Sequence, residues 1–167
     1  MVLTRGCPVT RVGVIHPIES YWLCRGPFVE SFEELDFRER AFADLTNWLL
    51  EGLVDFDFIS ESLLPNQIWQ PAQNCSHDQQ KTLTVGACDY ETVVIPNLKT
   101  IRRSTLEILR KFASSGGKVI IAGDSPTFLD AMVSQYPTSD LEIPGSLSIP
   151  FTRTDVLQAV EDQRDLL

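Results

Sequence analysis

The segment from Tyr90 to Gly123 constrains the fold of this chain more than any other, because it predicts a strand, a helix and a second strand. Its two apolar runs, Val93–Ile95 and Val119–Ile121, are continuous, which is typical of strands covered on both sheet faces. The stretch between them has apolar residues at helical spacing and ends at Gly116-Gly117, a left-handed stop. The crossover of such a unit is right-handed, so we expect parallel strands and an α/β fold.

Further elements on both sides extend this unit into a three-layer, mostly parallel sheet. The expected strands cover residues 11–15, 54–59 and 83–86. The expected helices start at a capping box of Ser31 and Glu34, at Thr100, near Phe128 and at Thr154. Residues 18–28, 61–80 and 137–150 contain prolines and mixed polar residues, and we expect irregular loops there.

The length of 167 residues allows one domain with a substantial core. We assign residues 1–10 to a linker from a preceding domain, and residues 11–167 to a single domain that is a piece of a longer polypeptide. A formal net charge of −9 argues against a nucleic-acid partner, since phosphate binding needs clustered Lys and Arg. No apolar run is long enough for a membrane span, and the absence of a signal-peptide pattern slightly favours the cytoplasm.

A catalytic cysteine or serine would need a nucleophile on a tight turn between a strand and a helix, with a histidine as base. The turn after the Val119 run is Gly123-Asp124-Ser125, which has no cysteine at its apex. Ser125 and Cys88 are the available nucleophiles, and both histidines lie upstream of Cys88. We expect no catalytic residue. The four cysteines lack C-x-x-C spacing and are expected to be free thiols: Cys7, Cys24, Cys75 and Cys88.

Cofactor sites find equally little support in the sequence. The Gly116-Gly117 pair precedes a strand, whereas phosphate-binding loops present their glycines at the start of a helix. His16 with Glu19, and His77 with Asp78, supply fewer than the three protein ligands of a catalytic zinc site. We therefore expect neither a metal nor a cofactor.

One loop keeps an alternative open. His16, Glu19, Tyr21 and Trp22 follow the first expected strand, and aromatic rings beside a carboxylate are suited to binding a sugar. The favoured interpretation is a packed loop over the strand ends, and a small sugar-binding site is the alternative.

Two stretches carry a resemblance to a known family. The sequence from Val93 to Gly123 resembles the non-catalytic amidotransferase-like domains of multidomain glycoside hydrolases, such as the trimerisation domain of the family 42 β-galactosidases. Residues 5–17 are similar to the junction by which α-L-rhamnosidase-like hydrolases enter that domain from their catalytic barrel. The chain departs from the family 42 pattern at 18–28 and 65–80.

The resemblance implies a class I glutamine amidotransferase-like fold, similar in topology to flavodoxin, in which Gly123, Asp124 and Ser125 occupy a vestigial nucleophile position. It implies a non-catalytic domain that packs on a catalytic barrel of the same polypeptide and can mediate homo-oligomerisation. Two alternatives remain, a stand-alone hydrolase that uses Cys88 or Ser125 and a small sugar-binding module.

Overall fold

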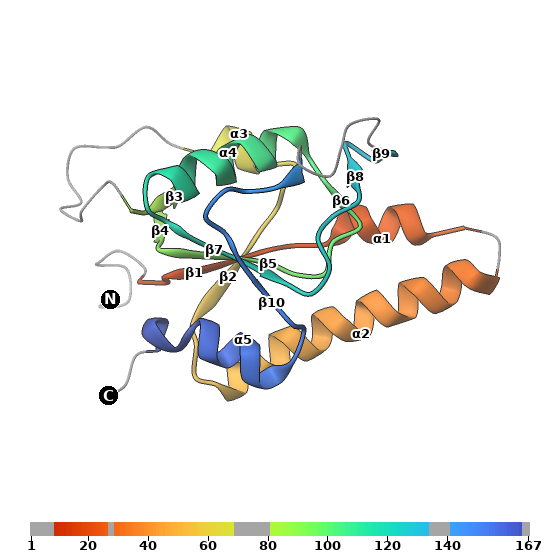
Figure 1. The fold of residues 1–167 in the computed structure, drawn as a ribbon, viewed down its shortest axis with the longest axis horizontal. Coiled ribbons are helices and arrows are strands. Elements are labelled where there is room, and N and C mark those ends of the chain that lie inside the picture. Colours follow the sequence, from red (N-terminus) through yellow and green to blue (C-terminus); the bar gives the residue numbers. More distant parts are fainter. Residues whose placement is uncertain (1–8, 27–28, 69–80, 134–140, 165–167) are drawn as a thin grey trace, which may run out of the picture.

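The fold is a three-layer α/β sandwich, as the sequence predicts. The computed structural model describes residues 9–26, 29–68, 81–133 and 141–164. Its centre is a five-stranded sheet in the order β10-β7-β5-β1-β2, in which every neighbouring pair is parallel (Figure 1). The strands are β1 (Val12–Ile15), β2 (Phe56–Ile59), β5 (Thr92–Ile95), β7 (Lys118–Ala122) and β10 (Leu147–Ile149).

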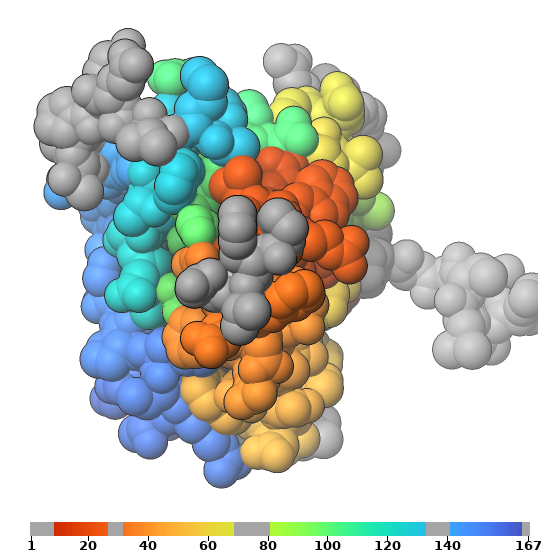
Figure 2. Space-filling model, turned by 90° about the vertical axis from the view of Figure 1, so that its right-hand side faces the viewer, coloured from red at the N-terminus to blue at the C-terminus, as the bar shows by residue number. Residues whose placement is uncertain are grey.

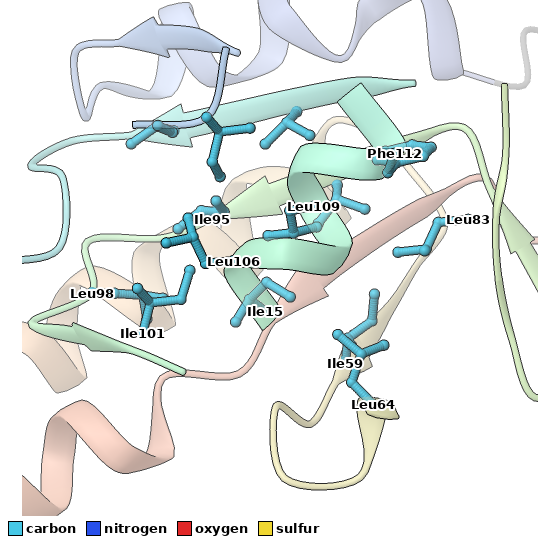
Figure 3. Packing of buried hydrophobic residues seen from close by; sticks show 14 of the residues in the cluster. Ile15, Ile59, Leu64, Leu83, Ile95, Leu98, Ile101, Leu106, Leu109 and Phe112 are labelled. Carbon is cyan, nitrogen blue, oxygen red and sulfur yellow. The ribbon is translucent and has the colours of Figure 1, made fainter. Parts of the chain in front are cut away.

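Helices cover both faces of this sheet. The long α2 (Val29–Glu51) and α5 (Arg153–Ala159) lie on one face, and α3 (Leu64–Gln67) and α4 (Arg103–Ser114) lie on the other (Figure 1). Each face has its own buried core. Figure 3 shows Leu106, Leu109 and Phe112 of α4 packed against the strands. Because successive strand residues point into different cores, the central strands are apolar at consecutive positions.

The central strand–helix–strand unit is confirmed. β5 and β7 pair in parallel, with Val93 opposite Val119, and α4 connects them. Gly116, with φ of +95°, takes the left-handed conformation expected of a helix stop. Gly13 in β1 has a different reason, because a Cβ atom there would lie 2.4 Å from Ile59 Cδ1. The side chains of Ile59 and Tyr90 therefore occupy the space that a side chain at this position would need.

The prediction of an irregular loop at 18–28 was wrong at its start, where α1 (Ile18–Cys24) forms. Ser20 and Cys24, four residues apart, turn the same helix face inward, and the Ser20 hydroxyl accepts hydrogen bonds from the backbone N–H groups of Lys99 and Thr100. These contacts outweigh the irregular local sequence. The next helix begins at Val29, two residues before the predicted capping box.

The start of α4 also differs from prediction. Thr100 lies in a short strand, β6 (Thr100–Ile101), and α4 begins after Arg102 without a side-chain cap from that residue. The final helix is capped by Thr152, whose hydroxyl oxygen accepts from the N–H of Asp155, rather than by Thr154.

The predicted helix near Phe128 is instead an antiparallel hairpin of β8 (Phe128–Leu129) and β9 (Met132–Val133), and β8 pairs with β6. The predicted third strand pairs outside the main sheet, as a hairpin of β3 (Leu83–Val85) and β4 (Cys88–Tyr90). β10 supplies the fifth strand from a segment that we expected to be a loop.

Several predicted features lie outside the described residues, namely Cys7, Cys75, His77 and the junction at residues 5–8. A 3₁₀ turn, η2 (Glu161–Gln163), closes the described part of the chain. Among the helices in the described ranges, none combines the length and apolar character that a bilayer crossing requires.

Candidate functional site at the carboxyl edge of the sheet

The strand order changes direction between β1 and β5, and in sheets of this type ligands bind beyond the carboxyl ends of the strands at such a point. The turns after these two strands are His16-Pro17 and Pro96-Asn97. Figure 2 looks onto this edge, where α1 (red) and the start of α2 (orange) lie over the sheet. This edge is therefore the first candidate for a functional site.

Arg38 of α2 occupies the space between the two turns. Its Nη1 donates to the carbonyl oxygen of Asn97 at 2.8 Å, and its Nε and Nη2 donate to Glu34 Oε1 at 3.1 and 3.0 Å. Lys99 Nζ also donates to both oxygens of Glu34, at 2.8 and 2.6 Å, and this hydrogen bond is the main cause of the lowered pKa of Glu34. The network ties α2 to the turn after β5.

Little space remains after Arg38 is in place. The cavity at the turns has a volume of about 10 Å³, which is enough for one water molecule at most. Tyr21 closes it on one side and donates its hydroxyl to the carbonyl oxygen of Arg38 at 3.4 Å. Burial raises the pKa of Tyr21 to about 12, so the phenol stays protonated at neutral pH. Among the described residues, the position where this fold commonly holds a ligand is filled by Arg38 and Tyr21.

His16 points into the core layer under α2. Its ring makes edge contacts with Phe42 and Phe58 at centroid distances of 5.2 and 5.8 Å. Burial lowers its pKa, so the imidazole is neutral at pH 7. Its surroundings are those of a packed structural histidine.

Glu19 and Trp22, the other predicted rim residues, differ in their surroundings. Glu19 forms an ion pair with Arg102 at 2.6 Å and its side chain is only 16% exposed. Trp22 is 62% exposed. Of the predicted sugar-contact residues, His16, Glu19 and Tyr21 thus each have a different partner within the domain, and Trp22 is exposed.

The turn predicted to be a vestigial elbow leads from β7 into β8, not into a helix. Gly123 follows β7 with φ of +92°, Asp124 and Ser125 are exposed, and the chain then continues to β8. A nucleophile elbow places its nucleophile between a strand and a helix, and the backbone N–H of the next residue helps to bind the oxyanion. A Cβ atom at Gly123 would also lie 3.3 Å from Phe151 Cβ and 3.4 Å from Asn97 Cγ. This turn lacks the geometry that activates a nucleophile.

The two described cysteines, Cys24 and Cys88, are free, as predicted. Burial raises the pKa of both thiols. The charge of Asp57 raises that of Cys88 further, and Asp57 also accepts a hydrogen bond from Tyr90 Oη at 3.2 Å. Reactive thiols need the opposite environment, with cations or a helix N-terminus that favour the thiolate.

Glu61 is a buried charged residue that sequence reasoning missed. It lies just after β2, is 2% exposed, and its Oε2 accepts from the backbone N–H of Arg102 at 2.9 Å, where α4 starts. Burial raises its pKa. Glu61 thus caps α4 from a distance of 41 residues in sequence. No local pattern marks this residue, because its partner is set by the tertiary fold.

Neither metal ligands nor similarity to known proteins indicates a function for the described residues. Within the described ranges, no group of three or more His, Cys, Asp or Glu residues is placed to hold a metal ion. Compared with family models, curated proteins and solved structures, the chain matches none of them.

Proposed function

We propose that this chain is a non-catalytic scaffold and assembly domain of a carbohydrate-active enzyme, a glycoside hydrolase. In this proposal it packs on a catalytic barrel of the same polypeptide and can contribute to homo-oligomer contacts. The resemblance of residues 93–123 to amidotransferase-like domains of such hydrolases supports the assignment to a carbohydrate-active enzyme. The geometry of the carboxyl edge supports a domain that does not itself catalyse a reaction.

One observation carries the proposal. The crevice where a flavodoxin-like sheet would bind a ligand holds the Arg38–Asn97 hydrogen bond and about 10 Å³ of space. Small-molecule pockets are larger by more than an order of magnitude, roughly 300–1,000 Å³. A substrate could enter this crevice only if Arg38 moved away from Asn97, and a shift of α2 that moved it would also break the ion pair between Glu34 and Lys99.

The two residues of the competing hydrolase hypothesis also support this interpretation. Cys88 lies beside Asp57 and Tyr90, where its thiol stays protonated, and Ser125 is an exposed residue in a turn without a following helix. The ring contacts of His16 are with Phe42 and Phe58, in the layer under α2. Cys88 packs against the core on the α4 side. His16 and Cys88 therefore lie on opposite faces of the sheet, where the imidazole cannot act as a base for the thiol.

The test compares the purified domain with the variants Ser125→Ala and Cys88→Ala. We expect no hydrolysis of aryl glycosides or glutamine by any of the three proteins, and an unchanged thermal midpoint for Ser125→Ala. Hydrolysis by the parent domain that is lost in either variant would establish the hydrolase alternative. The coding sequence next to this segment gives the complementary test, since a barrel with two catalytic carboxylates is expected there.

Assembly is tested on the same chain extended by its neighbouring domain. We expect light scattering to give one defined species, and deletion of residues 11–167 to reduce its solubility or its subunit number. An extended protein that keeps its mass, solubility and glycosidase activity after this deletion would remove the scaffold role.

A further inference from the structure

A second hollow lies at the opposite, amino edge of the sheet, beside the first residues of β5 and β7. Its volume is about 360 Å³, inside the range of roughly 300–1,000 Å³ that is usual for small-molecule sites. Two lysines, Lys81 and Lys118, and two carboxylates, Glu91 and Asp162, line it. Their formal charges cancel, so the hollow has no net attraction for an ion of either sign.

The charged groups of this hollow keep free hydrogen-bonding capacity. Lys118 Nζ donates to Asp162 Oδ1 at 2.8 Å, which uses one of its three N–H donors. The nearest approach of Glu91 to a cation is 3.9 Å, to Arg11 Nε, and the Glu91 side chain is 47% exposed. Donors and acceptors therefore stand side by side around the opening.

Two buried polar side chains that line the same hollow each have an oxygen atom without a partner. Thr92 is fully buried and Gln163 is 9% exposed. Neither Thr92 Oγ1 nor Gln163 Oε1 has a hydrogen-bond partner among the described residues. Buried polar atoms are nearly always paired in native proteins, because an unpaired one costs stability. Two such atoms at one hollow indicate that a binding partner supplies what the domain lacks.

We propose that this hollow binds a small neutral polyhydroxyl molecule of the size of a monosaccharide. A hydroxyl both donates and accepts, so one kind of group serves the Lys118 ammonium, the Glu91 carboxylate and the Gln163 amide oxygen. Gln163 reaches the molecule by turning its terminal amide, a torsion with broad minima. This inference goes beyond the scaffold role. Binding here needs neither a barrel nor an oligomer, so an experiment can contradict the binding site without contradicting the scaffold role, and the reverse.

The experiment is a titration of the ¹⁵N-labelled domain with D-galactose, L-rhamnose and D-glucose, followed by amide chemical shifts. We expect saturable shifts with at least one sugar, centred on residues 91–92, 116–118 and 162–163. Thr92→Val and Gln163→Leu should each weaken binding about tenfold, because each removes one hydrogen bond to the ligand. Trp22→Ala, at the opposite edge, is the matched control and should leave binding unchanged.

Each other outcome overturns the inference. One is that none of the three sugars gives saturable shifts up to its solubility limit. Another is that the shifts are centred on α1 and are removed by Trp22→Ala. A third is that both Thr92→Val and Gln163→Leu leave the binding unchanged. Saturable binding of L-proline, a zwitterionic probe, in place of the sugars would also overturn it. Thr92→Val replaces a buried hydroxyl with a methyl group of similar shape and should raise the thermal midpoint, whereas a lowered midpoint would show that the hydroxyl is already paired.

Discussion

The two edges of the central sheet differ in whether their polar groups are paired. At the carboxyl edge, Glu34 pairs with both Arg38 and Lys99, Arg38 also binds the backbone of Asn97, and the cavity between the described residues of the two turns has a volume of about 10 Å³. At the amino edge, buried polar atoms stay unpaired beside a hollow of about 360 Å³. Topology alone favours the carboxyl edge for ligands. The difference teaches that side chains delivered by the covering helices decide which edge stays open.

The largest expected effect on stability comes from replacing Arg38, which fills the carboxyl edge (the closed edge). Arg38→Met should lower the free energy of unfolding by about 2–3 kcal/mol, because it removes charge-assisted hydrogen bonds to Asn97 and Glu34. Urea denaturation measures the loss. The matched control is Arg40→Met on the same helix, which removes an exposed i,i+4 pair with Asp36 and should cost less than about 0.5 kcal/mol. Equal losses in the two variants would mean that the carboxyl edge is not closed by Arg38.

A substitution at the amino edge (the open edge) should change stability in the opposite direction. Thr92→Val should raise the free energy of unfolding by about 1 kcal/mol, because it removes a buried hydroxyl that lacks a partner. Thr100→Val is the control for a buried threonine whose hydroxyl is paired, since Thr100 Oγ1 accepts from the N–H of Ala131 at 3.0 Å. That variant should instead lose about 1–2 kcal/mol. If both variants lose stability in chemical denaturation, the contrast between the edges fails.

Glu61→Gln tests a smaller, pH-dependent effect at the closed edge. Burial raises the folded-state pKa of Glu61 above its ordinary value of 4.5. Its contribution to stability is therefore complete below that value and is lost as the pH rises through the folded-state pKa. Glutamine keeps an acceptor for the Arg102 N–H without the charge. We expect Glu61→Gln to melt higher than the parent at pH 7 and to match it near pH 4. A lower midpoint at pH 7 would show that the buried charge stabilises α4.

The smallest expected effect concerns the ion pair at the open edge. Lys118→Met should change the free energy of unfolding by less than about 1 kcal/mol, because the Lys118 and Asp162 side chains are 34% and 56% exposed. The change should shrink further in high salt. A loss that is large and insensitive to salt would mean that the pair holds η2 in place and that the hollow is a rigid structural feature.

The sequence predicted the centre of the fold because that part is encoded locally. β5, α4 and β7 each carry an apolar pattern that burial on both sheet faces requires. β10 escaped prediction because it is a three-residue edge strand, mostly exposed, so its residues need no apolar run. α1 escaped because it is fixed by Ser20 and its partners 79 and 80 residues away.

The side chains that fill the crevice at the carboxyl edge could not be predicted from the sequence. The turn at Gly123 shows in sequence that no cysteine occupies the apex. Which side chain fills the crevice depends on contacts such as that between Arg38 and Asn97, which are 59 residues apart. Arg38 is one of several charged residues on a polar helix surface, and nothing in its neighbours distinguishes it. Long-range pairing of this kind leaves no local periodicity to detect.

The close approach of Phe151 and Asn97 to Gly123 has a consequence for protein engineering. A cysteine introduced at residue 123 would adopt a left-handed backbone conformation beside two side chains that already touch the position of its Cβ. Phe151 or Asn97 would have to shift by a few tenths of an ångström to admit the new Cβ atom. A side chain at this corner would thus cost stability through both its backbone conformation and its packing.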